Sequence, residues 1–197
     1  MQKINIVKLS KLTIFLWTSI FFTTACADQK MDGASSMPDT PAGKLQTRIE
    51  KEGADLVLKD LYSNDDVWAE TLAMIATGDQ QWLVIANKLR SVSDSGASTQ
   101  LANAVGEALS FSPINVLEIS TERFSLDEIC SGPDVDDTRF DSYELSSQEI
   151  DKRIAMLGQV GGEELASKVN KCVDLLKQSR KHIAEFYGEE IESKPTD

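Results

Sequence analysis

EELASKVNKCVDLLKQSRKHIAEFY (Glu163–Tyr187) has the clearest hydrophobic period in the sequence and predicts one long C-terminal helix. One face of that helix carries Leu165, Val169, Cys172, Leu176, Ile183 and Phe186. Because these positions recur at intervals of three, four or seven residues, we expect this face to lie against the rest of the domain. The charged residues between them would face solvent.

Shorter helical patterns precede this helix. An apolar stripe from 45 to 62 is interrupted at Gly53, and Asn64 stands where it can cap the next helix. Trp68 and Trp82 head two short helices whose Leu and Ile residues repeat at helical spacing, so we expect both rings in the core. Another pattern follows over 101–109, and Pro113 after a serine opens one more short helix.

Two serine–glutamate capping boxes, Ser125–Glu128 and Ser146–Glu149, predict the starts of two later helices. No segment shows the sustained alternation of a strand. The sequence therefore predicts an all-α fold of several short helices and one long C-terminal helix. The serial short helices resemble a HEAT-type stack, although no period of 30 to 50 residues repeats.

The N-terminus has the pattern of an export signal. Lys3, Lys8 and Lys11 precede an apolar stretch over 12–22, which is too short to span a bilayer but typical of a signal peptide. We interpret residues 1–27 as a cleaved signal. Thr-Thr-Ala-Cys resembles a bacterial lipobox and would place a lipid on Cys26, whereas Ala-Cys-Ala permits ordinary cleavage before Asp28. Both readings remain open.

The rest of the chain divides by composition. Residues 28–43 are rich in Asp, Ser, Gly and Pro and are expected to form a flexible linker, 44–188 a single helical domain, and 189–197 a charged tail. Cys130 and Cys172 lie in the expected domain. Since an even number of cysteines in an oxidising compartment favours pairing, we predict a disulfide between them.

Charge restricts the partners. The chain has a net charge of −12, and removal of the three signal lysines leaves −15. Such a charge repels nucleic-acid backbones and anionic lipid headgroups, so we expect no nucleic-acid partner and membrane contact only through an N-terminal lipid. A basic protein or a cell-envelope component is compatible with it.

The segment 76–109, ATGDQQWLVIANKLRSVSDSGASTQLANAVGEAL, followed by SPINVL, resembles uncharacterised small exported bacterial proteins. The resemblance covers about a third of the chain and depends on Gly78-Asp79, Trp82-Leu83, Ser93-Asp94, Gly96 and the Pro-x-x-Val-Leu run. It implies a shared helical fold and no particular activity.

Catalytic signatures are not found in the sequence. His182 is the single histidine and lies near the end of the long helix, and the sequence has no nucleophile elbow, zinc spacing or phosphate loop. The acidic run with Asp134, Asp136, Asp137 and Asp141 fails as an EF-hand loop, because Arg139 and Leu145 occupy the essential Gly and Glu positions. We therefore assign no catalytic residue, metal site or cofactor.

The sequence favours a non-enzymatic interaction or accessory module in the periplasm or cell envelope. One alternative is a cell-wall hydrolase, which needs only a suitable pair of carboxylates. Residues available for such a pair are Glu70, Glu107, Glu118 and Glu128. Another alternative is an inhibitor or immunity protein that neutralises a basic toxin or hydrolase.

Overall fold

A computed structural model describes residues 39–121 and 123–189, and within these residues the fold is all-α. The signal peptide, Cys26, most of the expected linker and most of the charged tail lie outside the described residues. In order, the elements are α1 (Pro41–Glu52), α2 (Ala54–Tyr62), α3 (Asp65–Ala76), α4 (Gln80–Arg90), α5 (Ser95–Glu107), η1 (Ala108–Ser110), α6 (Pro113–Ile119), α7 (Leu126–Ile129), η2 (Thr138–Phe140), α8 (Tyr143–Leu157) and α9 (Glu163–Tyr187). The η elements are single turns of 3₁₀ helix.

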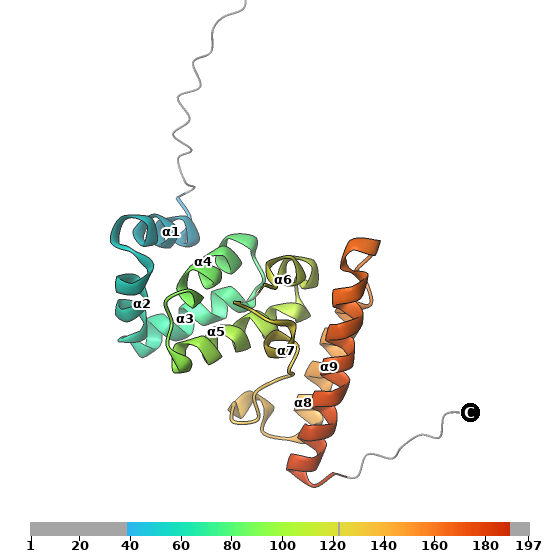
Figure 1. The fold of residues 1–197 in the computed structure, drawn as a ribbon. Coiled ribbons are helices and arrows are strands. Elements are labelled where there is room, and N and C mark those ends of the chain that lie inside the picture. The colour runs from blue at the N-terminus through green and yellow to red at the C-terminus, as the bar shows by residue number, and fades with distance from the viewer. Residues whose placement is uncertain (1–38, 122, 190–197) are drawn as a thin grey trace, which may run out of the picture. The chain divides into compact units, whose positions relative to one another are not determined.

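The first helices form a stack in which α3 packs against α5 and α4 against α6 (Figure 1). Helices α8 and α9 pack against each other and contact α6, so the chain adds successive helices to one continuous core. Trp68 and Trp82 are both buried in this core, as the helical spacing predicts. No helix in the described part of the chain combines the length and apolar character needed to cross a membrane.

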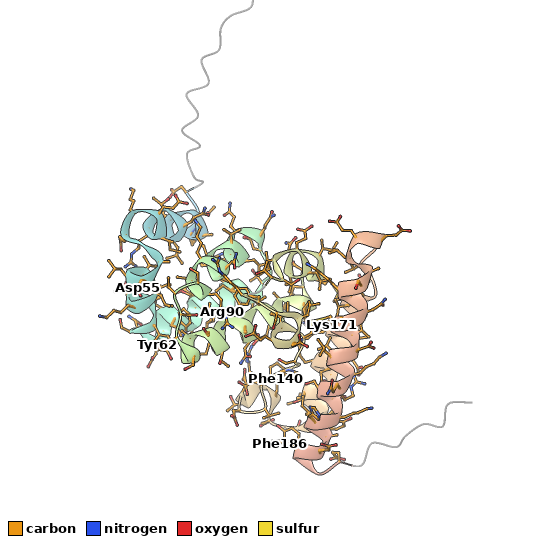
Figure 2. The ribbon with its side chains drawn as sticks, viewed as in Figure 1. Asp55, Tyr62, Arg90, Phe140, Lys171 and Phe186 are labelled. Carbon is orange, nitrogen blue, oxygen red and sulfur yellow. A yellow bond between two sulfur atoms is a disulfide. The ribbon has the colours of Figure 1, made fainter. Side chains whose placement is uncertain are left out.

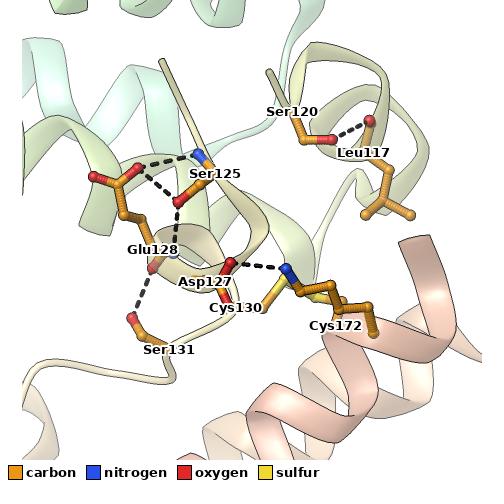
Figure 3. Close-up of a disulfide and its surroundings, with 9 residues drawn as sticks. Leu117, Ser120, Ser125, Asp127, Glu128, Cys130, Ser131 and Cys172 are labelled. Atoms are coloured by element: carbon orange, nitrogen blue, oxygen red, sulfur yellow. Dashed lines mark hydrogen bonds and ion pairs between the residues drawn. A yellow bond between two sulfur atoms is a disulfide. The ribbon is translucent and has the colours of Figure 1, made fainter. Parts of the chain in front are cut away.

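Local capping determines where the middle helices begin. Asn64, Asp79 and Asp94 each accept a backbone N–H of the turn that follows, at the starts of α3, α4 and α5. Each cap satisfies a donor that has no partner within the helix. The expected capping box at Ser125 and Glu128 is present and starts α7 (Figure 3).

The predicted disulfide is present. Cys130 at the end of α7 and Cys172 on the apolar face of α9 are bonded, with their Cα atoms 5.2 Å apart (Figure 3). Both cysteines are fully buried. Beside the bridge, Lys171 Nζ lies 2.8 Å from Asp127 Oδ2, so a covalent bond and an exposed ion pair join α9 to α7.

Two predicted helix starts are wrong. Helix α1 begins at Pro41, inside the expected linker, because Thr40 accepts the N–H of Gly43 at 3.0 Å and Pro41 suits the first helical turn. Helix α8 begins at Tyr143 with Ser142 as its cap, so the expected capping box at Ser146 does not form.

At α8 the reason is a contact with a residue outside the helix. Ser146 is buried inside α8 and its hydroxyl donates to Phe140 O at 3.2 Å, a tertiary contact that the sequence pattern does not reveal. On α9, Phe186 is 64% exposed and stacks edge-to-face on Tyr187 instead of entering the core. Figure 2 shows Phe186 near the C-terminal end of α9, where the helix extends past its contacts with α7.

Candidate functional site

A cleft of about 540 Å³ lies between α3, α5 and the segment 132–139. Its α3 wall is apolar, with Ala69, Ala73 and Ala76 at helical spacing and Leu72 beside them. Small side chains on this face leave room between the helices. The wall therefore offers a smooth apolar surface to an incoming group.

The α5 wall is polar. Gln100, Asn103 and Glu107 recur every three or four residues and so share one face of the helix. Gln100 Oε1 accepts the indole N–H of Trp68, which joins this wall to α3. Asn103 Nδ2 donates to Asp134 Oδ2 at 3.0 Å and thereby holds the opposite loop.

Arg139 fastens the segment 132–139 to α5. Its Nη1 and Nη2 donate to the two oxygens of Glu107 at 3.0 and 2.6 Å, and its Nε and Nη2 donate to Asp137. Hydrogen bonding from Arg139 lowers the pKa of Asp137 below its ordinary range, and the two carboxylates raise the pKa of Arg139. Asp137 and Arg139 are therefore ionised at neutral pH, and their hydrogen bonds fix one side of the cleft.

Arg153, from α8, lies at the floor of the cleft and is only 1% exposed. Its Nε donates to Glu149 Oε1 at 3.0 Å, and the same oxygen accepts the hydroxyl of Ser110 at 2.6 Å. Burial lowers the pKa of Arg153, while the charges of Glu149 and Glu107 act in the opposite direction. This buried ion pair lies within α8, and the bond from Ser110 to Glu149 joins α8 to η1.

The rim carries two carboxylates without a cationic partner among the described residues. Asp65 is in the first turn of α3, and Asp134 is held only by Asn103 and by the N–H of Asp136. In all, four carboxylates and two guanidiniums line the cleft. The cleft therefore has more carboxylates than guanidiniums. Both arginines are already bonded to carboxylates of this chain.

The structure separates the candidate residues proposed from the sequence. Glu107, Asp134 and Asp137 come together in the cleft, whereas Glu70 and Glu118 are exposed on α3 and α6 outside the lining. The other acidic candidates, Asp136 and Asp141, are exposed and also outside it, and His182 is exposed on α9.

Glu128 has a structural role. It completes the α7 capping box, and Arg90 Nη2 donates to its Oε1. Figure 2 places Arg90 on α4, where its guanidinium also lies 5.5 Å from the centre of the Phe124 ring.

Several cleft residues could not be found from sequence patterns. Asp65, Gln100 and Asn103 look like ordinary surface residues of two separate helices, and only tertiary packing brings them together. One signal was available: Arg153 interrupts the apolar stripe of Ile150 and Leu157 on α8. A charge within an apolar stripe indicates a buried ionic partner.

A smaller hollow of about 330 Å³ lies between α6 and the end of α8. It is mainly apolar, and its Phe111 and Ile114 are 58% and 47% exposed. The ammonium of Lys152 lies 4.1 Å from the centre of the Phe111 ring. Within the described residues no group of three or more His, Cys, Asp or Glu could hold a metal ion.

No family model, curated protein or solved structure matches this chain. The described residues form an all-helical fold, and no family is identified. Function is therefore inferred from the residues of the chain itself.

Proposed function

We propose that the protein is an exported, non-enzymatic interaction module of the cell envelope, and that its acidic cleft binds a basic segment of a partner protein. The observation that carries this proposal is the pairing of an apolar wall with unneutralised rim carboxylates. A lysine or arginine side chain has the same two parts, an aliphatic stem and a cationic head. The stem suits the alanine face of α3, and the head suits Asp65 and Asp134.

Charge supports the same proposal at long range. The net charge of −12 attracts a basic partner before contact, which raises the association rate at low salt. Charges on an open rim are screened by salt, with a Debye length of about 8 Å at physiological ionic strength. Binding should therefore weaken steeply as salt is added.

The cell-wall hydrolase alternative has less support. Glu107 and Asp137 are close enough to share one guanidinium, but Arg139 engages both of them. A general acid needs a raised pKa, whereas the pKa of Asp137 is lowered. An inhibitor or immunity protein is a specific form of the present proposal, in which the basic partner is a toxin or hydrolase.

Export and anchoring also belong to the proposal. The basic and apolar N-terminal residues support a signal peptide, and Thr-Thr-Ala-Cys supports a lipid on Cys26. The buried Cys130–Cys172 bridge is of the kind found in oxidising compartments. Intact-mass measurement of the processed protein tests this part, because an unlipidated chain that begins at Asp28 would refute the anchor.

The binding test is a calorimetric titration of the processed protein with a lysine-rich peptide. We expect the double variant Asp65→Asn, Asp134→Asn to bind about tenfold more weakly or worse, which corresponds to about 1.4 kcal/mol or more. A control variant with the same change in net charge is Glu163→Gln, Asp174→Asn, whose two sites lie on α9 outside the cleft.

The control should bind as the unaltered protein does. Equal losses in both variants would show that net charge alone attracts the peptide, and the cleft would then not be its site.

A further inference from the structure

Arg153 has more hydrogen-bond donors than its surroundings use. A guanidinium carries five N–H donors. Among the described residues, Arg153 makes one hydrogen bond, from Nε to Glu149 Oε1. The side chain is 99% buried, yet it forms part of the cleft surface. No nitrogen of Arg153 is both fully enclosed and unpaired, so its terminal nitrogens reach the cleft surface, where an acceptor would be stabilising.

The neighbouring carboxylates do not fill this need. Both oxygens of Glu107 accept from Arg139, at 3.0 and 2.6 Å. Glu149 Oε1 is shared between Ser110 and Arg153. The negative charge of Glu107 therefore partly offsets the positive charge of Arg153, but Glu107 accepts no hydrogen bond from the terminal nitrogens of Arg153.

The surrounding charges select the kind of acceptor. A carboxylate or phosphate at Arg153 would approach Glu107, Asp134 and Asp137 and be repelled by them. A neutral oxygen, such as a peptide carbonyl, avoids this repulsion. The polar wall fits the same chemistry, because Gln100 Nε2 and Asn103 Oδ1 have no hydrogen-bond partner among the described residues.

We propose, on the basis of the function proposed above, that the cleft recognises the main chain of the basic segment, with a backbone carbonyl oxygen accepting hydrogen bonds from Arg153. Gln100 and Asn103 offer one donor and one acceptor to the neighbouring peptide group. The basic side chain then extends along the α3 wall toward Asp65 and Asp134. The cleft thus selects a peptide over other cations of equal charge.

The test compares two probes that each carry three positive charges. One is an acetylated tri-lysine peptide with an amidated C-terminus, and the other is spermidine, which has no carbonyl oxygen. Titrated into the processed protein, the peptide should bind at least tenfold more tightly than spermidine. Equal affinities would overturn the role of Arg153 and leave the proposed function intact, whereas no binding of either probe would remove both.

A second readout does not depend on a variant that could fail to fold. In ¹⁵N NMR of the side-chain guanidiniums, the Arg153 resonances should shift with the peptide and not with spermidine, and those of Arg180 should not move. An unchanged Arg153 signal at saturation would overturn the inference. Tighter binding of an N-acetylglucosamine tetramer than of the peptide would also overturn the inference, because the carbonyl groups of the sugar would then be the recognised feature.

Discussion

Removal of the Cys130–Cys172 disulfide tests the architecture most sharply. The bridge joins residues 42 apart in sequence. In the chain-entropy model, closing a loop of that length stabilises the folded state by about 4 kcal/mol. We expect Cys130→Ala and Cys172→Ala each to lower the free energy of unfolding by about this amount. It is a large share of the roughly 5 to 15 kcal/mol of a typical domain.

The assay is urea denaturation followed by tryptophan fluorescence, for both single variants and the double variant. Because either single replacement already opens the loop, the double variant should be about as unstable as each single one. The coupling energy between the two positions is then about 4 kcal/mol. Additive losses, or a single-variant loss below about 1 kcal/mol, would refute the view that the bridge stabilises the domain through the loop it closes.

Two further predictions concern the surroundings of the cleft. Gly106→Ala should lower stability by about 1 to 3 kcal/mol, because its new Cβ would lie 2.8 Å from the backbone oxygen of Ile129; Gly161→Ala, with nothing within 4 Å, is the control in the same thermal melts. Hydrogen bonds from Arg139 lower the pKa of Asp137, so the ionised carboxylate stabilises the fold at pH values above 3.8, the ordinary pKa of the group. This stabilisation is lost as the pH falls below 3.8. Asp137→Asn should therefore destabilise the protein at about pH 6 and much less at about pH 3 in urea titrations, and an equal loss at both values would contradict this pairing.

Much of the architecture could be predicted because its signals are local. The period of α9 follows directly from its apolar positions, and the capping residues Asn64 and Asp79 determine where helices begin. The start of α8 could not be predicted, because Ser142 and Ser146 both suit a cap and only the contact between Ser146 and Phe140 decides between them.

The cleft could not be predicted for a related reason. Its walls come from α3, α5 and the segment 132–139, which are far apart in sequence. The acidic run with Asp134 and Asp137 stands out in the sequence, but only the fold shows that Asn103 bonds to Asp134 and that Glu107 bonds to Arg139. Composition indicated the negative charge, and the structure shows where part of it gathers.

The most direct test of the central claim is photo-crosslinking in whole cells from inside the cleft. A photoreactive phenylalanine analogue at position 73, on the exposed part of the α3 wall, is compared with the same analogue at position 166, on the exposed face of α9. We predict that position 73 captures one dominant partner through a lysine- or arginine-rich segment, and that position 166 does not. Capture of the same proteins from both positions, or of a partner through an acidic segment, would contradict the account.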